Sequence, residues 1–514
     1  MKKIIMLITL VSFLSTACNN FLNLNPLDQL SEDTFWKTSG DFDIALVSLY
    51  GGMQVDMFSW SLPCWDGITD NGFTQHQENQ YGMAQAIVTG NINSSSTGFI
   101  NQVYIKAYSS IVRANIFLKQ LNSFTGTMDE AAKAQYTAQA RMFRAHYYSY
   151  LYRCYGDVPI VDTPLDLKTQ FKAKSPATDV LSFIMADLDF AIANLPNVNY
   201  ITSKGHWTSS AAKAYKARML LYDAYDASGN AIPQKMTDVI SLLSGISGFT
   251  LAPDFTDNFA DAKQQNCPEI MMSVKFLAPN DWHSMDLWYG QWVVISPLAN
   301  LISEFEFLNG SPGIPIPMKA VGSSVIDISK FTDDSLAKRD PRLVKTIRYY
   351  NTNGVSYPGG GTSPLGASML KFSSRNLTPP YSATTYSQTD IILIRYADVL
   401  LMLAEAENEL NGSTAIAYRA INDIRKRAGM PNLPSGLTKE QMRAKIRHER
   451  RIELAFECSR YFDLKRWKIA KQVLNNVKDG VSTYSFLDKF YLWPIPQSEI
   501  DNGHGVLIQN PDYK

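Results

Sequence analysis

The side chains that carry most acid–base and metal chemistry are scarce in this chain. Its 514 residues include six histidines, at positions 76, 146, 206, 283, 448 and 504. The nearest approach to an H-E-x-x-H zinc site is His448-Glu449-Arg450-Arg451, which lacks the second histidine that such a site needs. We therefore expect no catalytic metal and no cofactor. Whether a calcium ion is bound is not readable from the sequence.

Patterns that accompany nucleophilic catalysis are also missing. The sequence contains no G-x-S-x-G elbow and no phosphate-binding glycine loop. Residues 335–338 (SLAK) match S-x-x-K, but the companion motifs S-D-N and K-T-G are absent. Two carboxylates could still meet in space and act as acid and base, although no local pattern selects a pair. We therefore expect a binding protein and not an enzyme.

Two segments combine tryptophan with polar side chains. They are residues 59–72 (SWSLPCWDGITDNG) and 280–292 (NDWHSMDLWYGQW), in a chain whose aromatic content is 12%. Exposed rings offer flat surfaces for stacking, and neighbouring carboxylates and amides can form hydrogen bonds with a ligand. The candidate binding residues are Trp60, Trp65, Asp66, Asp70, Asn71, Trp282, Trp288, Tyr289 and Trp292. The alternative is that these tryptophans pack the loops onto the core.

Cys18 follows a segment that is typical of export. Two lysines, at positions 2 and 3, precede an apolar run over residues 4–14, and three small residues lead up to the cysteine. This order is that of a secretory signal, and the run is shorter than the roughly 20 residues that span a membrane. We predict a signal peptide over residues 1–17 and a lipid on Cys18, as in a bacterial lipobox. The alternative is an ordinary signal with an incidental cysteine.

The four later cysteines are widely spaced, at positions 64, 154, 267 and 458. They form no C-x-x-C pair of the kind that suggests zinc or redox chemistry. Cys154 and Cys458 lie in helical patterns and are expected to be buried, whereas Cys64, between Pro63 and Trp65, is expected to be the most exposed. Export to an oxidising compartment would allow two of these cysteines to form a disulfide, and the sequence does not show which two.

Charge and length limit the remaining possibilities. The 48 basic residues balance the 48 acidic residues, so no field of one sign attracts nucleic acid. The length exceeds the roughly 250–300 residues at which a single hydrophobic core stops growing. We therefore expect more than one core, or a repeat-like layer with a second lobe.

Helical periodicity dominates both ends of the chain. In residues 129–153, Tyr136, Ala140, Phe143, Tyr147 and Tyr150 recur at steps of three and four, which predicts an amphipathic helix. Similar patterns predict helices over 98–121, 178–195, 208–226, 395–410, 414–428 and about 438–458, with another after position 461. Paired helices of this length favour a mainly α fold of tetratricopeptide-like hairpins. An irregular helical bundle is the alternative.

The middle of the chain is different. Residues 248–390 contain proline–glycine clusters and short apolar runs at 270–276 and 343–349, which predict small strands. We predict one mature domain over 18–514. Its helical scaffold covers about 30–246 and 392–475, and its loop-rich insert covers about 248–390 and faces the ligand.

Blocks with a family signature run from the N-terminal segment to the last residues. The most specific are residues 395–402 (RYADVLLM), 421–429 (INDIRKRAG), 449–457 (ERRIELAFE) and 492–496 (LWPIP). Residues 21–29, 34–37, 138–148, 155–160, 404–406, 460–467 and 509–513 add to them, in order. Together these blocks resemble the SusD/RagB family of outer-membrane nutrient-binding lipoproteins.

The resemblance implies a fold, a location, a partner and a ligand. Members of the family are mostly helical lipoproteins, held on the cell surface as lids over a TonB-dependent (SusC-like) outer-membrane channel. They capture oligosaccharides, or peptides in some members, without cleaving them. The resemblance also implies that the ligand face is built from the two tryptophan-rich regions. The alternatives are a peptide binder, an anchored glycan hydrolase and a purely structural subunit of the channel.

The charged residues of the C-terminal blocks are expected to be structural. Eight of them alternate in sign at helical spacing: Glu449, Arg450, Arg451, Glu453, Glu457, Arg460, Asp463 and Arg466. This spacing predicts i,i+3 and i,i+4 ion pairs, and guanidinium groups cannot act as bases at neutral pH. Arg395 and Asp398 are predicted to tie a helix to a loop.

Overall fold

The computed structural model describes residues 35–74, 84–314, 337–349, 367–374, 377, 381–477 and 482–513. The predicted signal peptide and Cys18 lie outside these residues, as does the block at 21–29. Within the described part of the chain, no helix is both long and apolar enough to cross a membrane.

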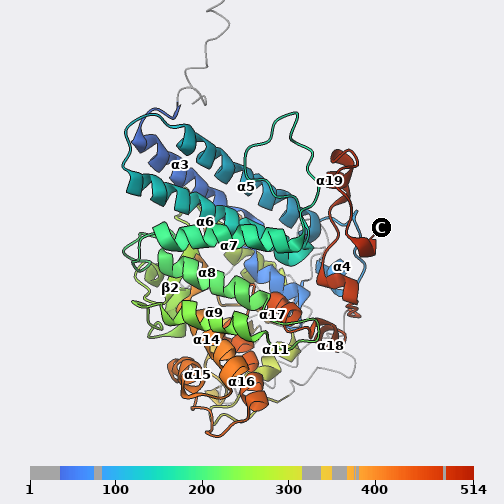
Figure 1. Ribbon diagram of the computed structural model, residues 1–514. Helices are drawn as coiled ribbons and strands as arrows, with labels where there is room; N and C mark the ends of the chain where they lie inside the picture. The colour runs from blue at the N-terminus through green and yellow to red at the C-terminus, as the bar shows by residue number, and fades with distance from the viewer. Residues whose placement is uncertain are drawn as a thin grey trace, which may run out of the picture.

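Helices stacked side by side form most of the molecule (Figure 1). The first six long ones are α3 (Ser39–Gly51), α5 (Phe99–Ser123), α6 (Glu130–Tyr155), α7 (Ala177–Asn194), α8 (Ser209–Tyr222) and α9 (Pro233–Ser244). The stack continues with α14 (Tyr396–Asn411), α15 (Ala415–Arg427) and α16 (Lys439–Glu453). From α5 to α9, each helix packs against the next one in sequence, and α14 then packs against α9. The predicted mainly α fold of helical hairpins is confirmed.

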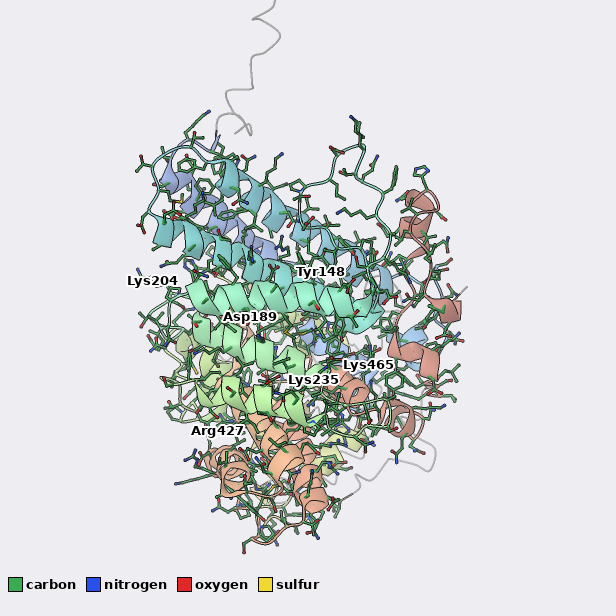
Figure 2. The ribbon with its side chains drawn as sticks, viewed as in Figure 1. Tyr148, Asp189, Lys204, Lys235, Arg427 and Lys465 are labelled. Carbon is green, nitrogen blue, oxygen red and sulfur yellow. The ribbon has the colours of Figure 1, made fainter. Side chains whose placement is uncertain are left out.

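Local sequence explains where these helices begin and end. The Asp129 side chain accepts a hydrogen bond from the Ala132 amide and caps α6. Gly412, with a φ of 82°, follows Asn411 and ends α14 between the helices predicted at 395–410 and 414–428. An ion pair between Asp189, labelled in Figure 2, and Lys216 joins α7 to α8.

One predicted helix is shorter than its periodicity suggests. α16 ends at Glu453, and Phe456 and Cys458 both have a positive φ, of 65° and 60°. The buried ammonium of Lys371 donates to the carbonyls of Glu453 (2.7 Å) and Ala455 (3.0 Å). A side chain from the loop-rich region thus satisfies carbonyls that further helix would have used.

Short strands and helical turns make up the region between α9 and α14. Strand β2 (Ile270–Val274) pairs with β6 (Ile391–Arg395), so the predicted strand at 270–276 is confirmed. The prediction at 343–349 is wrong in its first half, where α13 (Arg342–Thr346) precedes the short strand β4 (Ile347–Tyr349). The Asp340 carboxylate accepts from the Arg342 amide and starts this helical turn.

Two further strand pairs and several short helices complete the fold. β1 (Gly72–Thr74) pairs with β3 (Ile295–Pro297), and β4 pairs with β5 (Ala367–Met369). The short helices are α4 (Ala84–Val88), α10 (Asp261–Gln264), α11 (Ala299–Glu304), α17 (Arg460–Arg466), α18 (Ala470–Leu474) and α19 (Gln497–Asn502). A large core extends through most of the molecule, and a smaller one lies among α14, α15 and α16. The expectation of more than one core is confirmed.

Candidate ligand-binding surface

Three tryptophans from the two predicted segments lie together. The ring of Trp288 is 5.0 Å from that of Trp60 and 5.9 Å from that of Trp292, measured between centroids. Trp292 is 47% exposed, whereas Trp60 and Trp288 are half-buried. The half-buried rings hold the cluster in place, and Trp292 offers most of the accessible ring surface.

A second pair of rings comes from two different parts of the loop-rich region. Trp282 and Tyr386 are 36% and 41% exposed, and their centroids are 4.8 Å apart. Their neighbours His283 and Ser387 form an antiparallel bridge, with N–H···O distances of 3.0 and 3.1 Å. The backbone bridge therefore fixes the two rings beside each other.

The buried side chain of His283 lies between these two groups of rings. Its ring is parallel to that of Trp60, 6.4 Å away, and packs edge-on against Phe276 at 4.5 Å. Burial lowers the pKa of His283 to about 4, so the imidazole is neutral at pH 7. Nδ1 accepts from the Met285 amide, and Nε2 donates to the Thr389 carbonyl. This histidine is a spacer in the fold and not a proton-transfer group.

The backbone that carries Trp288 has an uncommon geometry. Residues Asp286–Gln291 form a π-helix, and the Trp292 amide bonds to the Leu287 carbonyl five residues earlier. Val293 follows with a φ of 50°, a conformation that costs a β-branched residue on the order of 1–3 kcal/mol. Such π-turns and strained residues are frequent at functional sites. We call Trp60, Trp282, Trp288, Trp292 and Tyr386 the tryptophan surface.

Five of the predicted binding residues lie in the interior instead: Trp65, Asp66, Asp70, Asn71 and Tyr289. Trp65 has no exposed surface and stacks on Trp493, with centroids 5.6 Å apart and planes 11° apart. It packs the helical turns of residues 62–68 onto the core, which was the alternative interpretation for these tryptophans.

The polar members of this group bind each other and the C-terminal helices. Asp70 pairs with Arg460 at 2.8 Å and with Arg451 at 3.0 Å. Although burial opposes the shift, these two guanidinium groups hold the pKa of Asp70 well below its usual range. Asn71 donates to Asp66 (2.7 Å) and accepts from Arg451 (2.8 Å). Burial raises the pKa of Asp66 to about 6.

Tyr289 is buried behind the tryptophan surface. Its hydroxyl donates to the Trp60 carbonyl (3.2 Å) and lies 3.1 Å from the sulfur of Cys64. Cys64 was expected to be exposed, which is wrong, because the turn that carries it is covered on all sides. Cys154 is buried as predicted, Cys458 is half-buried, and all four described cysteines are free.

Tyr386 lies outside the two tryptophan-rich segments. It stands with Tyr349, Tyr350 and Tyr381 as a secondary candidate, because all four lie in the irregular middle of the chain. Tyr381 is buried, and the side chains of the other two lie outside the described residues. The long-range bridge between His283 and Ser387 places Tyr386 beside Trp282.

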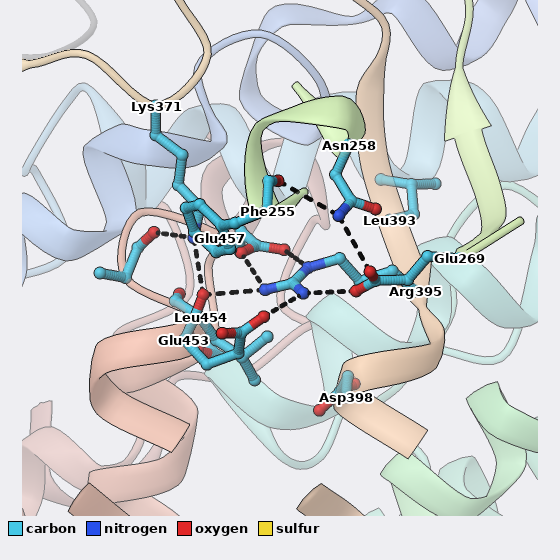
Figure 3. A network of polar contacts seen from close by, with 12 residues as sticks. Phe255, Asn258, Glu269, Lys371, Leu393, Arg395, Asp398, Glu453, Leu454 and Glu457 are labelled. Atoms are coloured by element: carbon cyan, nitrogen blue, oxygen red, sulfur yellow. Dashed lines mark hydrogen bonds and ion pairs between the residues drawn. The ribbon is translucent and has the colours of Figure 1, made fainter. Parts of the chain in front are cut away.

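The family blocks build a buried ion-pair network (Figure 3). Arg395 is 1% exposed and contacts Glu269 (2.7 Å), Glu453 (2.6 Å) and Glu457 (2.8 Å). Further ion pairs extend this group, and among the described residues the connected set contains six cations and six carboxylates. These are Arg342, Lys371, Arg395, Arg425, Arg427 and Lys445, with Glu269, Glu306, Asp340, Glu449, Glu453 and Glu457. We call this set the Arg395 network.

A second network joins α8, α14, α16 and α17. Asp398 pairs with Arg218 (2.8 Å) and Arg450 (2.9 Å), while Glu405 pairs with Arg466. Although burial opposes the shifts, these cations lower the pKa of both Asp398 and Glu405 to about 2. The predicted structural role is therefore confirmed. The predicted local spacing holds for Asp463 and Arg466, whereas the other pairs named here join residues far apart in sequence.

Among the described residues, no group of three His, Cys, Asp or Glu side chains is placed to hold a metal ion.

Comparison with known proteins finds matches along most of the chain. The profile described as "SusD family" matches residues 255–513, and the profile "Starch-binding associating with outer membrane" matches residues 28–221. SusD-like protein P2 from Formosa agariphila is 24% identical over 543 residues, covering 99% of this chain and 98% of that protein.

Two further relatives also align over nearly their full length. Starch-binding protein SusD from Bacteroides thetaiotaomicron is 23% identical over 574 residues, covering 99% of this chain and 98% of its own. The crystal structure of a SusD-like protein from Bacteroides fragilis superposes with a TM-score of 0.75 at 26% identity. That superposition covers 95% of this chain and 100% of the other.

Proposed function

We propose that this chain, which belongs to the SusD family as its sequence blocks predicted, captures a glycan at the cell surface and delivers it to a SusC-like TonB-dependent channel without cleaving it. The observation that carries the proposal is the tryptophan surface, where rings from three separate segments are grouped and partly exposed. The names of two matches, a starch-binding protein and a family associating with the outer membrane, support a carbohydrate ligand and this location.

The chemistry of the surface suits a sugar chain. A pyranose ring presents apolar C–H groups on its faces and hydroxyls at its edges, so it needs aromatic platforms flanked by polar groups. Trp292 and the Trp282–Tyr386 pair supply such platforms. A few stacked rings and hydrogen bonds suffice for dissociation constants from micromolar to millimolar, about −8 to −4 kcal/mol. Binding of this strength allows release to a channel.

The start of the sequence supports a membrane anchor. A lipid on Cys18 would hold the protein at the outer membrane, and the segment between this anchor and α3 would tether the helical stack. One acyl chain binds a membrane only marginally, so stable anchoring requires more than one. Exposure on the cell surface rests on family membership.

Affinity electrophoresis of the 19–514 fragment tests glycan binding directly. Gels would contain starch, laminarin, xylan, mannan or pectin, and we expect one of these polysaccharides to retard the wild-type protein. Trp282→Ala and Trp292→Ala should each reduce the retardation at least tenfold, because each removes an exposed platform. Phe171→Ala is the matched control, since Phe171 is 39% exposed but lies outside the tryptophan surface.

Several outcomes would contradict the proposal. Unretarded migration in all five polysaccharides would refute glycan capture. Equal retardation of wild type and both tryptophan variants would place the site elsewhere. Release of shorter sugars during incubation with the retarding polysaccharide would indicate a hydrolase.

A further inference from the structure

A hollow of about 250 Å³ lies at the junction of α3, the loop that precedes α8, and strand β2. The side chains that matter for its chemistry are those of Tyr50, Met53, Gln54, Lys204, His206 and Asp281. Figure 2 shows Lys204 at the edge of the helical stack, in the loop before the start of α8. The hollow is distinct from the rings of the tryptophan surface.

One wall of the hollow is a fixed aromatic stack. The rings of Tyr50 and His206 lie 4.8 Å apart, with their planes at 29°. The Tyr50 hydroxyl accepts from the Trp207 amide (2.7 Å) and donates to Gln139 (2.6 Å), which holds the tyrosine ring. Met53, 1% exposed, lies beneath. The wall therefore offers a rigid, flat and largely apolar surface.

The opposite side carries hydrogen-bonding groups that retain free capacity. Gln54 donates its amide hydrogens to Asp281 (2.6 Å) and to the Lys275 carbonyl (2.8 Å). Within the described chain, the amide oxygen of Gln54 and the ammonium of Lys204 have no partner. These groups supply an acceptor and a donor to whatever occupies the hollow.

The charge of the hollow is balanced. The ammonium of Lys275 is already bound by Gln265 (2.8 Å) and Asp390 (3.4 Å). The remaining charges at the rim are the positive ammonium of Lys204 and the negative carboxylate of Asp281. An anion or a cation would meet a like charge there, whereas an uncharged molecule rich in hydroxyls could use both groups.

The backbone links the hollow to the tryptophan surface at two places. Asp281, on its rim, directly precedes Trp282. The carbonyl of Gln54 accepts from the hydroxyl of Ser59 (3.1 Å), which directly precedes Trp60. Because adjacent residues carry the hollow and two of the rings, we infer that a chain molecule bound to the rings extends one of its units into the hollow.

We propose that this hollow is a second glycan subsite, which takes a single uncharged sugar ring from the end or a branch of the chain that lies on the tryptophan surface. The Tyr50–His206 stack faces the ring, and Gln54, Lys204 and Asp281 bind its hydroxyls. This inference rests on the proposed function and goes beyond it, because it predicts a preference for a glycan with an accessible end or side branch.

Two variants of the 19–514 fragment test the subsite in different ways. Val47→Trp fills the hollow from a rim position that is 65% exposed, and His206→Ala removes the outer ring of the stack. Val112→Trp makes the same substitution at a 36% exposed position of α5 and serves as the control. Binding to the retarding polysaccharide would be measured by affinity electrophoresis and calorimetry, and folding by melting temperature.

We expect Val47→Trp and His206→Ala to weaken binding at least fivefold, with Val112→Trp unchanged and all three melting near the wild type. If Trp282→Ala loses binding while Val47→Trp and His206→Ala bind as the wild type does, the second subsite is refuted and glycan capture stands. If none of the five polysaccharides retards the wild type, both proposals fail.

Discussion

Replacing Arg395 by methionine should destabilise the fold more than any surface substitution. The guanidinium donates through Nη1 to Glu269 and Glu453, and through Nη2 to Glu457 and to the Glu453 carbonyl. The Arg395 network balances six cations against six carboxylates, so Arg395→Met leaves one buried negative charge uncompensated. Breaking a buried pair in this way costs about 3–5 kcal/mol. That is a large part of a typical unfolding free energy of about 5–15 kcal/mol.

Urea unfolding followed by tryptophan fluorescence measures this loss. Lys471→Met is the control, because Lys471 pairs with Asp488 at 2.7 Å while the two side chains are 50% and 75% exposed. Such a surface pair is worth about 0–1 kcal/mol.

A double variant separates charge from packing. Arg395→Met with Glu457→Gln restores the balance of charge, and we expect it to recover at least about 1 kcal/mol of the loss. The reasoning would be refuted if Arg395→Met cost no more than Lys471→Met, or if the double variant were no more stable than Arg395→Met alone.

Three further predictions concern protonation and the anchor. Asp66 has a pKa of about 6 in the fold and a lower one in the unfolded chain, so its carboxylate destabilises the protein at pH 7. Asp66→Asn should therefore raise the unfolding free energy, measured by urea titration, by up to about 3 kcal/mol at pH 7, and this gain should shrink as the pH falls from 6 to 4. Asp398 and Glu405 have pKa values of about 2 in the fold, so their carboxylates stabilise it when the pH is above the pKa of these groups in the unfolded chain. Glu405→Gln should therefore lower the unfolding free energy by about 3 kcal/mol at pH 6, and this loss should decrease as the pH falls from 4.5 towards 2. Cys18→Ser should abolish labelling by an alkyne fatty acid and move the protein from the membrane fraction to the soluble fraction, whereas unchanged labelling would place the lipid elsewhere.

The helical stack was readable from sequence because its information is local. The stripe in α6 and the Asn-Gly turn after α14 depend on residues a few positions apart. The end of α16 could not be predicted, because it depends on Lys371, which lies about 80 residues earlier in the sequence. Its ammonium donates hydrogen bonds to the carbonyls of Glu453 and Ala455. Periodicity carries no information about such a partner.

The ligand surface was predictable as a region and not residue by residue. Trp65 and Trp292 occur in segments of the same composition, yet one is fully buried and the other is 47% exposed. The difference arises from distant contacts. Trp65 stacks on Trp493. The polar residues Asp70 and Asn71 that follow it bind Arg460 and Arg451. Composition identifies which segments can bind, and only the packing of the C-terminal helices decides which side chains remain accessible.

The pairing of β2 with β6 has a consequence for how such proteins can diversify. The chain leaves the stack after α9 and returns at α14, and these two helices are in contact. The intervening segment is thus a long loop whose ends are held together by the scaffold, and doubling the length of such a loop costs only about 0.6 kcal/mol. Binding specificity could therefore be transplanted between relatives by exchanging this segment, provided that its members of the Arg395 network are kept, because they pair with the C-terminal helices. The same junction is where a shortened or grafted variant should be joined.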